Sequence, residues 1–327
     1  MKTFNRILSL LVFVGLVSAC SAPAGQVLTP PATAAMPTAL PQPSATLAPS
    51  ETALPTPTQA PIGSATPTAI VLTVDALRNM QYNLPVSQKT VKLVNGQYEA
   101  GSGADYLLVK MADPIALGDI NGDGLDDGAV ILGENMGGSG VFESLIVVLD
   151  EGSVPTQWAA TQIGDRVKVN TVTIQDHQVI LEMVVPGPND PACCPSLGET
   201  QAYNLTKGGL FLTGLTSQPA NGAVRAIKIN GPLNYADAGT SVEVQGGFSF
   251  APFENTLTYT IQDDTHHVLD QGSFQVKPDT SGGSGTFDTT IDLSKSSPGM
   301  IIHLDIQDVS AADASILALG SVELTRK

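Results

Sequence analysis

Residues 118–132, GDINGDGLDDGAVIL, hold the densest group of side chains in this chain that could bind a ligand. Calcium prefers several hard oxygen ligands on a tight loop, commonly at alternating positions counted from a first aspartate. Gly124, at the sixth position, permits the sharp turn that such a loop requires. The sequence therefore predicts a structural Ca²⁺ site with ligands from five positions: Asp119, Asn121, Asp123, the carbonyl group of Leu125, and Asp127.

This loop is not an EF-hand, because its twelfth position holds Val130 where a bidentate glutamate would be needed. It resembles the Asp-x-Asn-x-Asp-Gly-x-x-Asp loops of FG-GAP propellers and, more distantly, those of dockerins. A propeller repeats its loop from blade to blade, so the single copy here excludes that fold. An Asp/Asn/Gly turn without an ion stays open as the alternative.

Two adjacent cysteines, Cys193 and Cys194, lie in the proline-rich segment PGPNDPACCPS. Cys20 is the third cysteine, so the chain is not a disulfide scaffold. Because exported thiols tend to be oxidised, a vicinal disulfide between Cys193 and Cys194 is one expectation. Their Cα atoms would lie about 3.8 Å apart, closer than the usual minimum of about 4.4 Å, so the bond would be strained and reducible. Two free thiols are the other expectation.

The N-terminus has a positively charged start and an apolar run over residues 7–17, which is the layout of a secretory signal peptide. The letters VSAC at 17–20 resemble the bacterial lipobox, in which signal peptidase cuts before the cysteine and its thiol carries diacylglycerol. The resemblance implies that residues 1–19 are removed and that Cys20 is lipidated. The protein would then be anchored to the cell membrane and face its extracytoplasmic side.

Residues 20–72 are expected to form the lipidated cysteine and a disordered linker. Positions 21–70 contain eleven of the 23 prolines and nine threonines, with Glu51 as their one charged residue and no apolar periodicity. The formal net charge of the whole chain is −16. Such an acidic protein repels nucleic acid and attracts divalent cations, so we expect no nucleic-acid partner.

From residue 73 the chain changes to short runs rich in Val, Ile, Leu and Thr, separated by Asn-Gly, Gly-Gly and Asp-Gly turn signals. One short helix is expected first, over TVDALRNMQY, capped by Thr73 or Asp75. KLVNGQYE is typical of a hairpin that turns at Asn95-Gly96. Because no long amphipathic helix lies between the strand runs, we predict an all-β fold with a small antiparallel β domain over 73–216.

A second break, SQPANGA at 217–223, precedes seven short alternating runs over 224–327, at the spacing of a β-sandwich. The segments PFENTLTYTIQDDTHHVLDQGSFQV, GTFDTTIDL and DIQDVSAADASILALGSVEL resemble the immunoglobulin-like domain of bacterial spore germination proteins. Gly239-Thr240 and Ala314 depart from that pattern, where Ser-Pro and a glycine are expected. The resemblance implies an immunoglobulin-like β-sandwich that is a non-catalytic module of exported or anchored proteins.

The remaining polar residues do not indicate a reaction. The four histidines, His177, His266, His267 and His303, are expected at the surface, and no Gly-x-Ser-x-Gly elbow is present. Trp158, the only tryptophan, is expected in the core. We therefore predict no catalytic residues and no enzyme. The chain would be a cell-surface lipoprotein that acts as a binding or structural interaction module for an unknown envelope protein or polymer. The alternative is an exported hydrolase or hydrolase inhibitor that uses the 73–216 domain.

Overall fold

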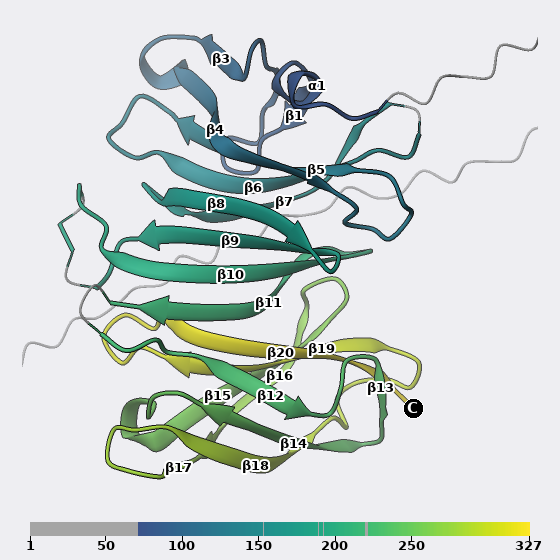
Figure 1. Cartoon of the computed structure of the whole chain (residues 1–327), viewed down its shortest axis with the longest axis vertical. Coiled ribbons are helices and arrows are strands. Elements are labelled where there is room, and N and C mark those ends of the chain that lie inside the picture. Colours follow the sequence, from purple (N-terminus) through teal and green to yellow (C-terminus); the bar gives the residue numbers. More distant parts are fainter. Residues whose placement is uncertain (1–70, 153, 189, 192, 220–221) are drawn as a thin grey trace, which may run out of the picture. The chain divides into compact units, whose positions relative to one another are not determined.

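The N-terminal half is built on an antiparallel sheet of five strands. The structure is a computed structural model that describes residues 71–327 apart from 153, 189, 192 and 220–221. The strands are β3 (Gln97–Ala100), β4 (Leu107–Gly118), β5 (Asp127–Asn135), β6 (Phe142–Leu149) and β7 (Thr156–Asp165), and they lie in this order in the sheet (Figure 1). β5 is buried along nearly its whole length because both faces of the sheet are covered. This explains why its sequence is a continuous apolar run rather than an alternating one.

A helix and a hairpin cover one face of this sheet. They are α1 (Val74–Arg78), β1 (Gln81–Asn83) and β2 (Thr90–Lys92). The Thr73 hydroxyl caps the helix by accepting a hydrogen bond from the Ala76 N–H, as expected. The helix ends at Arg78, earlier than expected, because the chain enters the β1–β2 pair directly afterwards. Leu77 of α1, Tyr82 of β1 and Val91 of β2 share one buried core with side chains of the sheet. The sheet residues in this core include Met111, Val130, Leu132 and Ile146.

The chain turns at Asn95-Gly96 as the sequence predicts, but β2 and β3 do not pair as a hairpin beyond one bridge, because β2 pairs with β1 and β3 pairs with β4. Asn95 and Gly96 both have positive φ, 52° and 79°, and Val94 bridges Gln97 across them. This is the backbone that a two-residue turn between twisted strands requires. A short 3₁₀ turn, η1 (Gly103–Asp105), follows before β4.

Four further strands cover the second face of the five-stranded sheet. They are β8 (Lys168–Gln175), β9 (Gln178–Val185), β10 (Leu197–Thr206) and β11 (Gly209–Gln218), paired antiparallel in sequence order. Apolar side chains from the two layers form a core, and the buried Tyr203 hydroxyl group donates to Gln201 Oε1 at 2.6 Å. Its main members are Ile131, Leu145, Val147, Val172, Leu181, Tyr203 and Leu210.

The C-terminal half is a β-sandwich, as the sequence predicts. Its elements are β12 (Ile227–Gly231), β13 (Ala236–Ala238), β14 (Ser241–Phe248), η2 (Phe253–Asn255), β15 (Thr256–Asp263), β16 (Val268–Gln275), β17 (Lys277–Pro278), β18 (Gly285–Asp292), β19 (Ile301–Val309) and β20 (Ile316–Arg326). One sheet has the order β12-β14-β18-β17, and the facing one contains β16-β15-β19-β20. Side chains from both sheets, among them Val244, Phe248, Leu257, Phe287, Leu304 and Val322, form one core.

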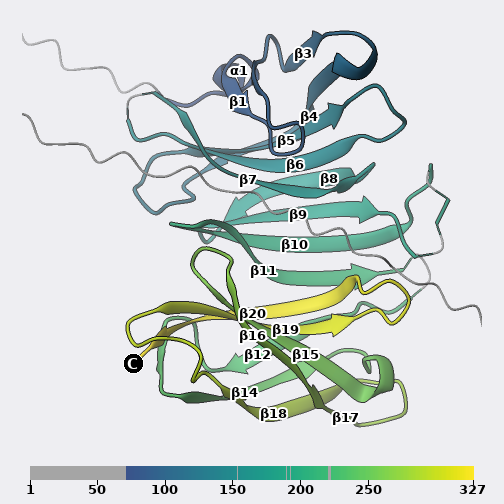
Figure 2. The ribbon, with the colours of Figure 1, turned by 180° about the vertical axis from the view of Figure 1, so that it is seen from behind.

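The two halves share a continuous sheet. β11 pairs antiparallel with β20 through Gly214–Gly320 and two adjacent residue pairs, so one sheet runs β16-β15-β19-β20-β11-β10-β9-β8 (Figures 1 and 2). The Ser217 hydroxyl adds a hydrogen bond to the Leu317 carbonyl oxygen at 2.6 Å. The expected boundary at 217–223 therefore lies inside one compact unit, which contains both halves. Whether each half folds alone stays a prediction.

An aromatic stack fills the junction between the halves. Phe211 on β11 lies between two imidazole rings, that of His266 at 3.8 Å and that of His303 at 3.7 Å between centroids. The expectation that His303 lies at the surface is wrong, because its ring is 2% exposed. β19 is an interior strand of the sheet, and this face of it is covered by Phe211. Burial lowers the pKa of His303, which favours the neutral ring.

Candidate functional site

The acidic loop predicted as a metal site connects β4 to β5, and its side chains bind its own backbone. Asp119 Oδ1 accepts from the Gly122 N–H at 2.6 Å, and its Oδ2 accepts from the Gly124 N–H at 3.1 Å. Asn121 and Asp123 each accept from the N–H two residues further along. Positive φ at Gly122 (82°) and Gly124 (86°) closes the loop. The turn is thus held by Asx-type hydrogen bonds in the structure.

Asp127 anchors the end of this loop from inside the protein. It is fully buried, and its carboxylate accepts three backbone hydrogen bonds, from Ile120, Asn121 and Asp150. Burial raises the pKa of Asp127, and these three donors oppose the shift. Among the residues that the structure describes, no three or more His, Cys, Asp or Glu side chains converge as a metal site would require. Calcium binding by Asp119, Asn121, Asp123, Leu125 and Asp127 stays a prediction.

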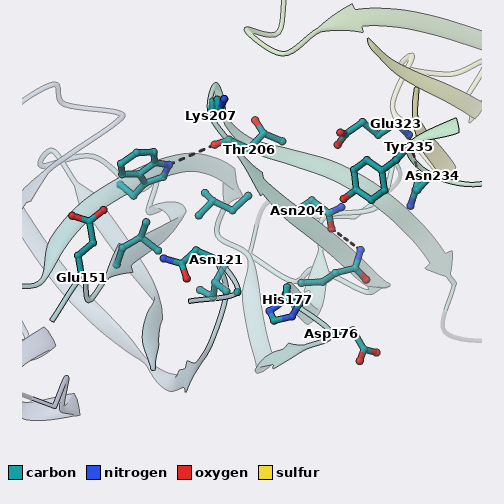
Figure 3. Close-up of a pocket in the computed structure, with 16 residues that line it drawn as sticks. Asn121, Glu151, Asp176, His177, Asn204, Thr206, Lys207, Asn234, Tyr235 and Glu323 are labelled. Carbon is teal, nitrogen blue, oxygen red and sulfur yellow. Dashed lines mark hydrogen bonds between the residues drawn. The ribbon is translucent and has the colours of Figure 1, made fainter. Parts of the chain in front are cut away.

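The loop forms one wall of a cleft with a volume of about 800 Å³. Loops and strand ends from both halves line it, so residues far apart in the sequence face one another. Figure 3 shows Glu151 at one side, Tyr235, Asn234 and Glu323 at the other, and Asn121, His177 and Asn204 between them. The described lining contains no serine or cysteine. We call this the Trp158–Tyr235 cleft, after the two aromatic residues that line it.

Trp158 is exposed on this cleft, so the expectation that it lies in the core is wrong. Its side chain is 49% exposed, and its indole N–H donates to the Thr206 carbonyl oxygen at 3.5 Å. The cause is a bulge in β7. Gln157 and Ala159 pair with the neighbouring Val148 and Val147, which leaves Trp158 between them without a partner. A bulge of this kind redirects a side chain away from the face that simple alternation predicts.

Tyr235 lies on the opposite side of the cleft and is held there by β20. It is 67% exposed and has a φ of 65°, a left-handed conformation that is rare for a bulky residue. Its N–H donates to the Glu323 carbonyl oxygen at 2.6 Å. Asn234 Oδ1 in turn accepts from the Glu323 N–H at 2.9 Å. These two hydrogen bonds fix the Asn234–Tyr235 turn to the last strand of the chain.

Several polar side chains that line the cleft are held by neighbouring groups. Gln178 donates through Nε2 to Asn204 Oδ1 at 2.6 Å. His177, exposed at the tip of the β8–β9 hairpin, has Nδ1 3.0 Å from the Asp119 carbonyl oxygen, so this nitrogen donates and ties the hairpin to the acidic loop. The hairpin tip at Asp176 and His177 has positive φ at both residues.

Cys193 and Cys194 lie outside this cleft, in the connection between β9 and β10. Both are exposed, and in the structure both thiols are free. The first cause that raises the pKa of Cys194 is its side-chain hydrogen bond with the neighbouring Cys193, which favours the protonated Cys194 thiol. The nearby Asp190 carboxylate holds the connection together by accepting from the backbone of Gly187 and Ser196. A bond between the two cysteines in the exported protein stays a prediction.

The lipidation site Cys20 lies outside the described residues. Within residues 71–327, as far as the structure describes them, no helix has the length and apolar character needed to cross a membrane.

One comparison with known proteins found a match. Residues 226–315 match the family model described as the immunoglobulin-like domain of bacterial spore germination, and no curated protein matches the chain. The match begins just before β12 and ends just before β20, the strand that joins the sandwich to β11. It therefore covers most of the β-sandwich and none of the strands of the N-terminal half. The C-terminal part of this chain is similar to that family, whose immunoglobulin-like fold is typical of a non-catalytic binding or structural module.

Proposed function

We propose that this chain is a lipid-anchored protein of the cell envelope and that the Trp158–Tyr235 cleft is its non-catalytic binding site. The observation that carries the proposal is the exposure of Trp158 and Tyr235 on one concave surface. Two large aromatic side chains exposed toward the same cleft mark an interaction site more often than a structural one. The matched immunoglobulin-like domain supports a binding role, because Asn234 and Tyr235 lie within its residues 226–315.

The acidic loop and the anchor complete this proposal. Asn121 and Gly122 line the cleft, so a calcium ion on the loop would stiffen one of its walls. Lipid on Cys20 and the expected linker would hold the cleft outside the membrane. Extracellular modules bind calcium with dissociation constants of roughly 10⁻⁴–10⁻³ M, which suits an exported protein.

The anchor is tested by Cys20→Ser in the bacterium that makes the protein. Membrane and soluble fractions are compared, and the mature N-terminus is analysed by mass spectrometry. We expect diacylglycerol on Cys20 of the wild type, and either release or lack of processing of the variant. A variant that stays with the membrane, beside a wild type without lipid, would contradict the anchor.

The binding role of the cleft is tested with the chain from residue 21, which lacks the signal peptide and the lipidated cysteine. Wild type, Trp158→Ala and Phe253→Ala are immobilised and exposed to cell-envelope extract. Phe253 is a matched control because it is 60% exposed and does not line the cleft. We expect envelope material to be retained by wild type and Phe253→Ala and lost with Trp158→Ala. Equal retention by all three would place binding elsewhere.

A further inference from the structure

We infer that the Trp158–Tyr235 cleft takes a neutral saccharide chain, with the two aromatic rings as stacking platforms and the cleft amides as hydrogen-bonding partners. The inference rests on the proposed function of the cleft as a binding site. Four separate features of the cleft support it: the rings, the backbone at Tyr235, the amide groups, and the balance of charge.

The aromatic rings offer the flat apolar faces that sugars use. A pyranose has C–H groups on its faces and hydroxyl groups at its edge, so one ligand needs both an aromatic surface and polar groups. Trp158 is 49% exposed and Tyr235 is 67% exposed, and both line the cleft. Each ring also has a polar group, the indole N–H or the phenol hydroxyl. Such a ring can contact apolar groups with its face while its polar group forms a hydrogen bond.

The backbone at Tyr235 indicates that its exposed position has a use. A bulky residue at a φ of 65° costs free energy, and residues strained in this way cluster at binding sites. The strain is held by the Glu323 carbonyl oxygen and by the Asn234 side chain, which come from strands and turns of the sandwich. The backbone that carries the ring is therefore positioned before any ligand arrives, which reduces the entropy lost on binding.

Four amide side chains line the cleft: Asn121, Gln178, Asn204 and Asn234. An amide both donates and accepts, which matches a hydroxyl group that does the same. The Gln178–Asn204 hydrogen bond uses Gln178 Nε2 as donor and Asn204 Oδ1 as acceptor. That bond orients both groups and leaves Gln178 Oε1 and Asn204 Nδ2 for a ligand. The Oδ1 of Asn234 likewise accepts from the Glu323 N–H, which leaves its Nδ2 to donate to a ligand.

The charges around the cleft oppose an anionic ligand. Among the described residues, Glu151, Asp176 and Glu323 line it with Lys207 as the one cation, and the whole chain has a net charge of −16. A phosphate, a sulfate or a uronic acid would meet a negative field here. Carboxylates accept hydrogen bonds from hydroxyl groups, so the same residues suit an uncharged sugar.

Tryptophan fluorescence can be used to detect a ligand in this cleft without an added label, because Trp158 is the only tryptophan in the chain. Intrinsic fluorescence of the chain from residue 21 therefore measures ligand contact at Trp158 directly. The probes are short neutral oligosaccharides of glucose, mannose, xylose and N-acetylglucosamine, with oligogalacturonate as the anionic probe and oligolysine as the cationic probe. We expect a saturable shift in emission with at least one neutral probe, at a dissociation constant below about 1 mM, and none with oligogalacturonate.

Two variants locate the site. Tyr235→Gly removes the ring and keeps the left-handed backbone, which glycine adopts freely, so the fold is preserved. We expect it to weaken binding of the neutral probe by about tenfold or more, the size that loss of one aromatic contact gives. Phe253→Ala, an exposed aromatic outside the cleft, should bind as the wild type does.

The outcomes separate this inference from the proposed function. Binding of a neutral probe that weakens in Tyr235→Gly supports the inference. The inference is overturned if no neutral probe binds, if Tyr235→Gly binds unchanged, or if oligogalacturonate or oligolysine binds more tightly. If envelope material still depends on Trp158 while every neutral probe fails, the cleft is a binding site for another class of ligand, and only the saccharide inference falls.

Discussion

The ring of Phe211 on β11 stacks on the imidazole of His303 on β19, with centroids 3.7 Å apart and planes inclined by 13°. The two residues are far apart in the sequence and belong to different halves of the chain. Phe211 is 4% exposed and His303 is 2% exposed, so the contact is an interior one. This contact packs the two halves against each other at their junction.

Phe211→Ala should therefore destabilise the protein by about 3–5 kcal/mol, the usual cost of removing a buried phenylalanine. Chemical denaturation of the chain from residue 21 measures this free energy of unfolding. Phe253→Ala is the matched control, since Phe253 is 60% exposed, and it should change stability by less than about 0.5 kcal/mol. Similar costs for the two variants would show that the junction contributes little.

Glu143 on β6 gives a pH-dependent prediction. Its carboxyl group packs over Gly133, Oε2 is buried without a hydrogen-bond partner, and burial raises its pKa to about 7. A carboxyl group with a raised pKa stabilises the fold at low pH, and this contribution is lost as pH rises through about 7. Glu143→Gln should thus gain about 1–3 kcal/mol over wild type at pH 8, the cost of a buried unpaired group, and lose that advantage toward pH 5.

The measurement for Glu143→Gln is its melting temperature minus that of wild type across this pH range. The lowered pKa of His303 makes the stability of both proteins rise with pH, opposite to the effect of Glu143. Subtracting the melting temperature of wild type removes this shared contribution. Glu254→Gln, at an exposed position, should show no such trend. A difference that is independent of pH would mean that Glu143 titrates normally.

Ala314 sits in the turn between β19 and β20 with a φ of 61°. This is the position where the family pattern leads us to expect glycine, and a left-handed backbone explains the preference. Ala314→Gly should raise the free energy of unfolding by about 0.5–1 kcal/mol. Glycine relieves the backbone strain of the folded state, and this gain exceeds the loss that comes from the greater freedom of the unfolded chain. Ala311→Gly, in the same turn without positive φ, should lower stability or leave it unchanged. If the melting temperature fell for both variants, the backbone at Ala314 would not be strained enough for glycine to relieve it.

Calcium should raise the melting temperature of the wild type by a few degrees, since a ligand at about ten times its dissociation constant adds roughly 1.4 kcal/mol. Asp119→Ala and Asp123→Ala should abolish the shift. Asp126→Ala, at an exposed position of the loop that is not a predicted ligand, should keep it. Equal melting temperatures of the wild type in calcium and in chelator would leave the loop as a turn held by its own hydrogen bonds.

The state of Cys193 and Cys194 is read by alkylation of protein purified from the cell envelope. A vicinal disulfide predicts that neither thiol is labelled before reduction and that both are labelled after it. Because both residues are exposed, free thiols would be labelled without reductant. Labelling of the untreated protein is therefore the result that would rule out the bond.

The sequence determined the fold class through periodicity. Alternating apolar residues predicted the seven main strands of the sandwich, and the apolar run GAVIL predicted the strand that is β5 in the structure. Thr73 and the Asn95-Gly96 pair also predicted their own local structure, because a cap and a two-residue turn depend on neighbouring atoms alone. The sequence did not predict β7 and β10, because both strands are polar and only partly buried, and the alternation of apolar residues is weak on such strands.

The candidate site was decided by tertiary structure. The exposure of Trp158 depends on a bulge relative to β6, and the left-handed turn at Tyr235 depends on hydrogen bonds to Glu323. The pairing of β11 with β20 uses backbone groups that every residue has, so it leaves no pattern in the side chains. A local pattern records which face of an element is apolar, whereas the partner that covers this face is set by the packing of the whole chain.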